Sequence, residues 1–317
     1  MKRIDAIHNL LTIRYGITPK TICEVQGGWS AKAYRINTGD HSYFLKAYDK
    51  SLPSIRPWIK RIDNYMPVLG WLSGTPELGK NVIHPITTID SRYKAETAEF
   101  VYVLFDYIVG ETPGEKGLTD KQTTELAGII ARLHNLKNIA CDNPGLAEDL
   151  SIPFCEKIKL FLEKEPTNND LSRLIFPHTD ILREAIMVTS HLRDTVRIDA
   201  TPLVLCHADA HPFNVIQSDR LVLVDFEDLK WAPAEIDLII YALSPNWEVF
   251  WNAYSAVRPD FQINSSLMKF YLIRRRLDDI WSDIARISYE KPNEEEIAQM
   301  NGWVKNAISD IKQLLSG

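Results

Sequence analysis

The sequence predicts an α+β protein with a small N-terminal lobe, built on a mostly antiparallel sheet and one helix, and a large, mainly helical C-terminal lobe. Two observations predict this fold class. Before about residue 110, short β-like runs are separated by turn residues such as Gly27-Gly28. Beyond that point, apolar residues recur at helical spacing in one segment after another. We therefore expect an N-terminal lobe over 1–109 and a C-terminal lobe over 110–317.

The N-terminal lobe is expected to begin with a short helix, because Ile4, Ile7 and Leu10 recur at helical spacing. Short β-like runs separated by turn residues are typical of antiparallel hairpins. A helix with a kink or a break at Pro67 is expected over 56–72, because proline cannot donate a helical hydrogen bond. The expected strands cover 22–25, 33–36, 43–48, 82–89 and 100–108.

The C-terminal lobe is expected to contain seven helices and one small β-like island. The helical patterns cover 120–136, 151–163, 178–197, 234–243, 247–256, 267–288 and 294–315. The island consists of β-like runs at 203–206, 215–216 and 221–224.

Composition excludes several classes of protein. The formal net charge of −6 argues against a large nucleic-acid footprint, which needs clustered Lys and Arg. The four cysteines form no CxxC pair, so spacing offers neither a zinc site nor a disulfide framework. The N-terminus does not resemble a signal peptide, and no apolar stretch reaches the roughly 20 residues that span a bilayer. We expect a cytoplasmic protein without membrane contact, with a monomer and a homodimer both open.

The most informative segment is 203–228, LVLCHADAHPFNVIQSDRLVLVDFED. It presents Asp209 in a loop, Asn214 five residues later, and Asp225 after a short hairpin. Each residue alone is an ordinary turn former or cap, and only the combination is informative. This spacing suits phosphoryl transfer: Asp209 would orient and deprotonate an acceptor hydroxyl. Asn214 and Asp225 would bind Mg²⁺, which prefers hard oxygen ligands.

The segment HADAHPFN resembles the catalytic loop HGDxHxxN of the aminoglycoside phosphotransferases and related small-molecule kinases. The resemblance spans about 20–245 and implies a protein-kinase-like two-lobed fold that binds Mg²⁺ with ATP or GTP. Asp225 stands where the family has its metal-binding aspartate. Asp237 resembles an anchor that supports the loop together with His207. The segments SYFLKAY and VLCHADAHPFNV are similar to the spectinomycin phosphotransferase-like branch, whose activity implies antibiotic resistance.

The N-terminal half resembles the nucleotide-binding half of the same family. GGWSAKAYRI is similar to the loop whose backbone N–H groups cover phosphates, and Lys46 matches the strand lysine that grips them. LFDYIVG resembles the hinge, whose backbone meets the nucleotide base. Without this context the glycines form a hairpin turn and the lysine is solvated. The implied nucleotide-binding residues are Gly27, Gly28, Ser30, Lys46, Asp106 and Ile108.

The sequence departs from the family pattern at three places. Kinase-like folds pair the strand lysine with a glutamate of the next helix, but no Glu lies between Lys46 and Pro76. Asp63 is the best-placed acid, and a surface role for it is the alternative. Ala208 replaces a glycine, which is a small change only if the backbone is not left-handed. Glu227 replaces the other glycine, as a metal ligand, a substrate anchor or a surface residue.

The acceptor in this family is held by carboxylates and aromatic side chains, and it is usually cationic. Asp279 and Asp283 share one helix face, although the preceding Arg274-Arg275-Arg276 also allows plain intrahelical ion pairs. The candidate substrate-binding residues are Glu227, Asp228, Trp231, Asp279 and Asp283.

Three alternatives remain beside a kinase of aminoglycosides or aminocyclitols. The first is a metabolite kinase acting on choline, a sugar or an amino alcohol, because the catalytic loop indicates the reaction and not the acceptor. The second is a metal-dependent hydrolase using His207, Asp209 and His211. The third is a nucleotide sensor without turnover. A protein kinase is disfavoured, because no APE-type segment follows Asp225.

Overall fold

The computed structural model of the chain describes residues 2–28, 30–137, 143–164, 170–196, 201–290 and 292–316. The chain forms two compact units, each assembled from two stretches of sequence. The first unit comprises Met1–Ala147 and Leu203–Phe261, and the second comprises Glu148–Pro202 and Gln262–Gly317. The lobe boundary expected near residue 110 lies inside the first unit and stays a prediction.

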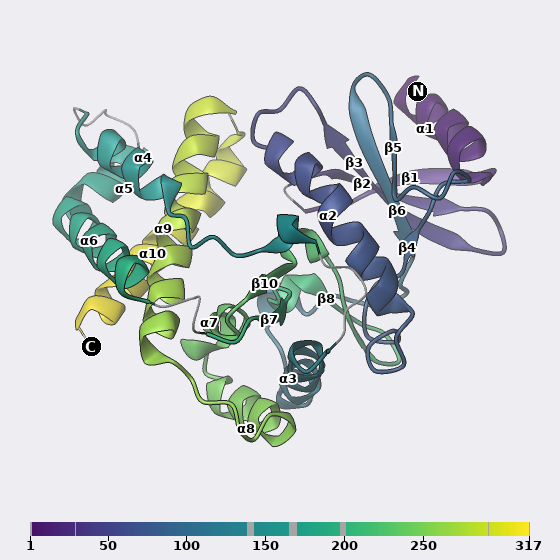
Figure 1. Cartoon of the computed structure of the whole chain (residues 1–317). Coiled ribbons are helices and arrows are strands. Elements are labelled where there is room, and N and C mark those ends of the chain that lie inside the picture. Colours follow the sequence, from purple (N-terminus) through teal and green to yellow (C-terminus); the bar gives the residue numbers. More distant parts are fainter. Residues whose placement is uncertain are drawn as a thin grey trace. The chain divides into compact units, whose positions relative to one another are not determined.

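An antiparallel sheet forms the N-terminal part of the first unit (Figure 1). Its strand order is β1-β2-β3-β6-β4, and β5 also pairs with β6. The strands are β1 (Thr21–Val25), β2 (Lys32–Asn37), β3 (Ser42–Asp49), β4 (Pro85–Ile86), β5 (Lys94–Glu96) and β6 (Phe100–Asp106). Successive strands are joined by short turns at the first two connections, as the glycine-containing segments of the sequence predict.

The central strand β3 places its side chains alternately on the two faces of the sheet. Leu45 and Ala47 belong to a core cluster with residues of α1 (Lys2–Leu10) and of the π-helical turn Leu11–Tyr15. Lys46 and Tyr48 therefore point to the opposite face. The helix α2 (Arg56–Ser73) contacts β4 and runs in front of the sheet in Figure 1.

The rest of the first unit holds two small two-stranded antiparallel sheets against helices. One sheet pairs β7 (Val204–Cys206) with β10 (Lys230–Ala232), and the other is the hairpin of β8 (Val215–Gln217) and β9 (Leu221–Leu223). The helices are α3 (Asp120–His134), α7 (Glu235–Ala242) and α8 (Trp247–Val257). A capping box of Thr119 and Gln122 begins α3, which packs against α8, β7 and β9.

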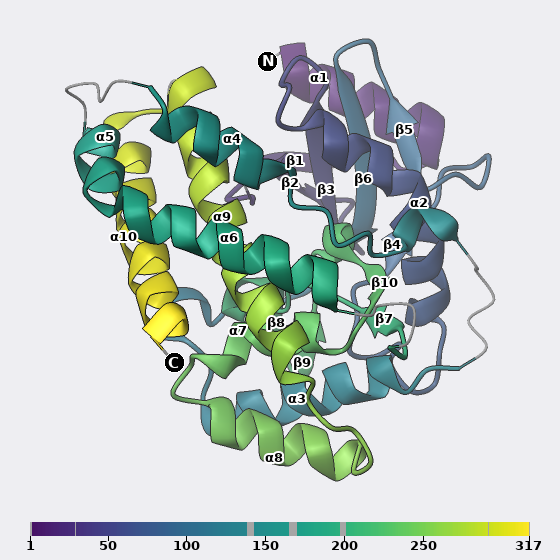
Figure 2. The same cartoon turned by 60° about the vertical axis from the view of Figure 1, so that its left-hand side comes forward.

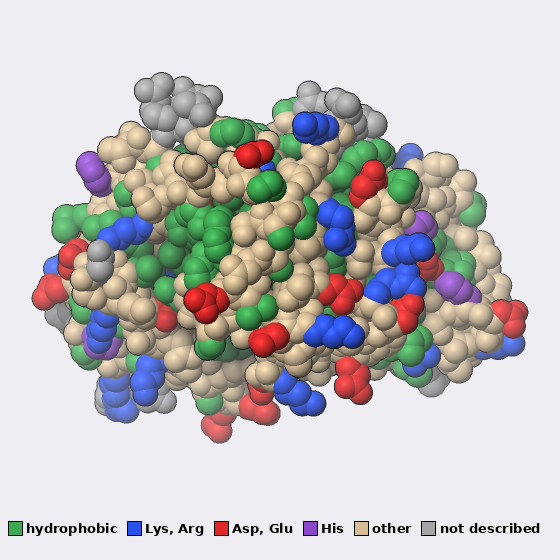
Figure 3. All heavy atoms as spheres, turned by 90° about the horizontal axis from the view of Figure 1, so that it is seen from below, with side chains coloured by type: hydrophobic (Ala, Val, Ile, Leu, Met, Phe, Trp, Pro, Cys, Tyr) green, Lys and Arg blue, Asp and Glu red, His purple; other side chains and the backbone are tan. Residues whose placement is uncertain are grey.

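The second unit is helical (Figure 2). Its helices are α4 (Pro153–Leu162), α5 (Asp170–Ile175), α6 (Thr179–Thr195), α9 (Ser265–Tyr289) and α10 (Glu294–Ser316). The long helix α9 contacts α4, α6 and α10. None of the helices in the described ranges is both long and apolar enough to cross a membrane. On the face shown in Figure 3, acidic and basic side chains are interspersed.

The predicted α+β fold class is confirmed, and several element boundaries are corrected. The helix α2 continues through Pro67, because the buried side chains of Met66 and Leu69 keep it packed. The strand expected over 82–89 is limited to β4, since Val82 forms an isolated bridge to Leu223. The short elements β5, β10 and α5 were not predicted. The helix expected over 178–197 ends at Thr195, and residue 197 lies outside the described residues.

Candidate active site

The loop that follows β7 brings Asp209 and Asn214 into contact. The Nδ2 group of Asn214 donates to the Asp209 carboxylate Oδ2 at 2.9 Å and to its backbone carbonyl at 2.9 Å. The Nε2 atom of His211 lies 3.3 Å from the same carboxylate oxygen. A 3₁₀ turn over Pro212–Asn214 produces this arrangement, since it folds Asn214 back onto Asp209.

Asp237 of α7 anchors the same loop, and its side chain is fully buried. Its carboxylate accepts hydrogen bonds from the backbone N–H groups of His207, at 2.9 Å, and of Ala208. It also lies 2.9 Å from Nε2 of His134. The side chain expected to support the loop is therefore in direct contact with it.

The ring of His207 is engaged at both nitrogen atoms. Its Nε2 lies 2.9 Å from the carbonyl oxygen of Val224, so this nitrogen carries the proton and donates. Its Nδ1 accepts from the backbone N–H of Asp209 at 3.2 Å. His207 thus joins the loop to the strand that leads into Asp225, and it has no ring nitrogen left for a metal.

Ala208 has a left-handed backbone, with φ of 65°. This conformation costs an alanine roughly 1–2 kcal/mol relative to a right-handed one, whereas glycine adopts it freely. The replacement of the family's glycine is therefore not neutral here. The hydrogen bond from Ala208 N–H to Asp237 holds the loop in this conformation.

Asp225 follows β9 and lies beside two parts of the sequence that are expected to bind the nucleotide. Its Oδ1 accepts from Nζ of Lys46 at 2.8 Å. A Cβ added to Gly28 would lie 3.9 Å from its Oδ2, so the loop between β1 and β2 reaches Asp225. Gly27 is required sterically, because a Cβ there would lie 2.9 Å from the carbonyl oxygen of Ala31.

Lys46 makes its shortest contact with Glu227, at 2.6 Å. Both side chains are buried, with Lys46 8% and Glu227 6% exposed. The hydroxyls of Tyr48 and Ser30 donate to the same Glu227 oxygen at 2.5 Å and 3.2 Å. Glu227 therefore lies among the residues expected to bind the nucleotide and not on an open substrate surface.

The electrostatics of this cluster favour an ion pair. Burial alone would lower the pKa of Lys46, but the carboxylates of Asp225 and Glu227 outweigh burial and raise it. Burial raises the pKa of Glu227, and the Lys46 ammonium opposes that shift. The 2.6 Å separation of Lys46 Nζ and Glu227 Oε1 is that of a short, charge-assisted hydrogen bond. Burial also raises the pKa of Tyr48, so its hydroxyl remains a donor.

The structure does not bring Asp63 to Lys46. Asp63 pairs with Lys94 of β5 at 2.7 Å, and its side chain is 66% exposed. Asp228, a candidate substrate residue, lies 3.4 Å from Arg61 of α2 and 3.9 Å from Lys230. The helix that follows Lys46 is thus tied to the segment after Asp225 through Arg61 and not through an acid.

The hinge-like segment after β6 is held by backbone and side-chain contacts. The N–H of Asp106 donates to the carbonyl of His84 at 3.0 Å, so this N–H is not available to a nucleotide base. The Asp106 carboxylate contacts His41 at 2.9 Å and His84 at 3.3 Å. Asp106 and Ile108 also line a hollow of about 430 Å³ together with Arg220.

The remaining candidates for substrate binding lie apart from this cluster in the sequence. Trp231 lies in β10, opposite Leu205. Asp279 pairs with Arg275 at 2.9 Å and with Arg276 at 3.3 Å, both on its own helix α9. Asp283 is half-buried on α9, where burial and the charge of Asp279 raise its pKa to about 7.

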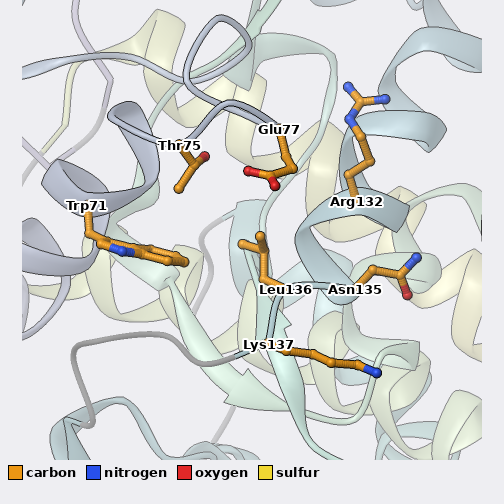
Figure 4. Close-up of a pocket in the computed structure, with 7 residues that line it drawn as sticks. All are labelled: Trp71, Thr75, Glu77, Arg132, Asn135, Leu136 and Lys137. Carbon is orange, nitrogen blue, oxygen red and sulfur yellow. The ribbon is translucent and has the colours of Figure 1, made fainter.

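A second hollow, of about 250 Å³, contains none of the predicted site residues (Figure 4). Trp71 and Leu136 extend toward each other across it, whereas Lys137 points away. Its lining residues are Trp71, Thr75, Glu77, Arg132, Asn135, Leu136 and Lys137. Asp209, Asn214 and Asp225 line neither of the two hollows.

The side chains around Asp225 fit a magnesium ion. Asn214 uses its amide N–H groups on Asp209, so its carbonyl oxygen is the atom that can bind a metal. Two carboxylates, Asp225 and Glu227, face the single ammonium of Lys46, which leaves negative charge for a divalent cation to offset. Among the described residues, His134, Cys206 and Asp237 also lie close enough to hold an ion, but His134 and Asp237 already form the loop anchor.

Fold and site together define a kinase-like phosphotransferase: a sheet that carries a buried lysine, and a loop with the spacing of Asp209, Asn214 and Asp225. The sequence matches the model of the phosphotransferase enzyme family over residues 21–261. The chain belongs to this family, and the predicted family and enzyme class are confirmed.

Solved structures share the fold at low sequence identity. Spectinomycin phosphotransferase in complex with ADP and spectinomycin has a TM-score of 0.73 and 19% identity, with 98% of each chain covered. Choline kinase from Streptococcus pneumoniae has a TM-score of 0.64 and 14% identity, covering 99% of this chain and 100% of that one. A microcompartment-associated aminopropanol kinase has a TM-score of 0.63 and 16% identity, covering 99% and 98%. No curated protein sequence gives a significant match.

Sequence reasoning missed the contacts of three residues. Tyr48 shares the alternating face of β3 with Lys46, which is a signal that was available. His134 contacts the anchor Asp237, which lies 103 residues further along the chain. His211 was considered only as a hydrolase ligand, and it lies beside Asp209.

Proposed function

We propose that the protein transfers the γ-phosphate of ATP or GTP, bound with Mg²⁺, to a hydroxyl group of a small cationic molecule of the aminoglycoside or aminocyclitol type. One observation carries this proposal: Asp209 and Asn214 are in contact in a single loop, and Asp225 is paired with Lys46. The proposal gives these groups the roles of base, metal ligands and phosphate-binding cation.

In the reaction, Asp209 accepts the proton of the acceptor hydroxyl as the oxygen forms a bond to the γ-phosphorus atom. The bond between that phosphorus and the oxygen bridging to the β-phosphate breaks, and the proton later leaves Asp209 for solvent. Lys46 holds the α- and β-phosphates, and the backbone N–H groups of Gly27, Gly28 and Ser30 cover them. Asn214 and Asp225 would hold Mg²⁺, which would neutralise part of the negative charge of the phosphates.

Similarity to three solved structures supports a cationic acceptor. Their names specify spectinomycin, aminopropanol and choline, which are alcohols that carry a nitrogen. The structure named for spectinomycin supports the branch suggested by the sequence, and with such an acceptor the reaction would confer antibiotic resistance. The structures named for choline and aminopropanol support a metabolite kinase as the second candidate. Spectinomycin phosphotransferase structures with bound ADP and with bound AMP support an adenine nucleotide as the donor, which favours ATP over GTP.

The hydrolase alternative is disfavoured by His207. A metal site with Asp209 and His211 would need a ring nitrogen of His207, and both nitrogens are engaged within the protein. The sensor alternative differs from the proposal only in turnover, so it is tested directly by experiment.

The test is a coupled nucleotide-turnover screen with Mg²⁺ and ATP or GTP across spectinomycin, aminoglycosides, choline, aminopropanol and sugar alcohols. We expect acceptor-dependent turnover that falls about 10²–10⁴-fold in Asp209→Asn, because the base is lost, while nucleotide affinity is retained. Asp225→Asn should instead weaken nucleotide binding only when Mg²⁺ is present. Wild-type turnover in Asp209→Asn would contradict the assignment, and nucleotide binding without any turnover would favour a sensor.

A further inference from the structure

We infer that Glu227 is the positioning residue for Lys46, in the role that an acid of the next helix has in other kinase-like folds. The inference rests on the proposed function, because it assigns Lys46 to the phosphates. It concerns how that lysine is kept in place while its second partner, Asp225, binds a metal.

The contacts of Glu227 fix it to the sheet. One of its carboxylate oxygens accepts hydrogen bonds from Nζ of Lys46 at 2.6 Å, from the Tyr48 hydroxyl at 2.5 Å and from the Ser30 hydroxyl at 3.2 Å. Lys46 and Tyr48 are two residues apart on the same face of β3. Glu227 therefore holds the lysine against its own strand, in a site that is almost closed to water.

The helix α2 has no acid available for this role. Asp63 is its only acidic residue, and that carboxylate is exposed and paired with Lys94. In protein kinases, movement of the corresponding helix breaks the lysine–glutamate pair and switches the enzyme off. Here the acid that pairs with Lys46 follows Asp225 by two residues, in a segment that Arg61 of α2 contacts through Asp228 and the Leu229 carbonyl.

Glu227 and Asp225 are not equivalent partners. Asp225 must serve both Lys46, at 2.8 Å, and the metal proposed above. When its carboxylate turns to a cation, Glu227 is the remaining anion that keeps the buried ammonium paired. An unpaired buried charge is strongly destabilising, so the second acid makes this exchange possible.

The experiment compares Glu227→Gln with two matched acid-to-amide variants, Asp63→Asn and Glu96→Gln. Glu96 lies on the same sheet and pairs with Lys50 and Lys94 at its exposed side. Calorimetry would measure ADP binding with and without Mg²⁺, and steady-state assays would give kcat and the KM for nucleotide. We expect Glu227→Gln to weaken Mg²⁺-dependent ADP binding about tenfold and to require more Mg²⁺, because Lys46 then retains Asp225.

Each outcome decides the inference. Glu227→Gln with wild-type Mg²⁺ requirement and ADP affinity would overturn it, as would an equal loss in Asp63→Asn. If no acceptor is phosphorylated by the wild type, the proposed function fails while ADP binding still tests Glu227. If Glu227→Gln unfolds at a lower temperature than the wild type, Tyr48→Phe is measured in its place. Tyr48→Phe keeps the Glu227 carboxylate and removes one of its hydrogen-bond donors. A several-fold weaker Mg-ADP affinity is expected there, and an unchanged affinity would refute the inference.

Discussion

At Ala208 the backbone is held in a conformation that a side chain opposes. Its φ of 65° puts the Cβ atom close to the following carbonyl oxygen. Two N–H groups, of His207 and Ala208, donate to the buried carboxylate of Asp237, and this pair of bonds fixes the peptide orientation. The strain is therefore retained by the anchor, next to the residue proposed as the base.

Replacing Ala208 with glycine should relieve this strain. We expect Ala208→Gly to stabilise the protein by about 1 kcal/mol, since relief of the left-handed conformation exceeds the entropy that glycine adds to the unfolded chain. Urea unfolding would measure the change. Ala208→Val is the matched opposite and should destabilise, because a branched Cβ fits this region worst. A glycine variant less stable than the wild type would contradict the conformational argument.

Three helices meet at the catalytic loop through one line of hydrogen bonds. Burial lowers the pKa of His134, so its ring is neutral and Nε2–H donates to Asp237. Its Nδ1 must then accept, and the Tyr254 hydroxyl donates to it at 2.7 Å. Arg258 donates in turn to the Tyr254 oxygen at 2.6 Å. The end of α8 is thus connected through α3 to α7 and the loop.

Removing the Tyr254 hydroxyl should break this line. We expect Tyr254→Phe to destabilise the protein by about 1–3 kcal/mol, because the buried Nδ1 of His134 loses its donor. The proposed kcat should fall with little change in KM for nucleotide. Tyr34→Phe is the control, since the buried Tyr34 hydroxyl has no hydrogen-bond partner within the described part of the chain. Equal losses of stability in Tyr254→Phe and Tyr34→Phe would contradict a stabilising role for this chain of hydrogen bonds.

At the scale of the whole molecule, the titration of Asp283 makes the free energy of unfolding depend on pH. Its folded pKa of about 7 is above the unfolded value of about 3.9. Between these values the unfolded chain loses the proton that the folded chain keeps, so Asp283 lowers stability as pH rises from about 4 to 7. Above pH 7 the cost is constant.

We therefore expect Asp283→Asn to match the wild type near pH 4 and to be more stable at pH 8. The gain should be about 1–2 kcal/mol, because partial exposure screens the charge. Urea unfolding at both values would test this. Asp310→Asn should change stability in the other direction, since its carboxylate pairs with Arg276 at 2.7 Å. A gain for Asp283→Asn that is independent of pH would rule out its titration as the cause.

The sequence predicted the parts of the site that depend on local spacing. Asp209 and Asn214 are five residues apart, so one loop suffices to bring them together. The pair of Lys46 and Glu227 spans 181 residues, and its formation depends on how β3 packs against the segment after β9. The expectation for Asp63 rests on analogy with the helix acid of other kinase-like folds. The spacing of residues along the sequence determines neither how two elements pack nor how a helix is rotated about its axis. The rotation of α2 places Asp63 beside Lys94.

The fold was predictable where one pattern governed a segment. Strong helical periodicity located α9 and α10 to within two residues. The ends of β4 and the existence of β5 depend on pairing with β6, a tertiary property. Pro67 shows the same limit, because packing of α2 outweighs the one hydrogen bond that proline removes.

The separation of Lys46 from its partners has a consequence for protein synthesis. Asp225 follows Lys46 by 179 residues, and the stretch 148–202 of the other unit is translated between them. At about 5–20 residues per second, a ribosome exposes the lysine on the order of ten seconds before either acid. During that interval its ammonium group stays hydrated. A nascent chain can therefore complete the sheet early, but the nucleotide site forms only when nearly the entire first unit has been translated.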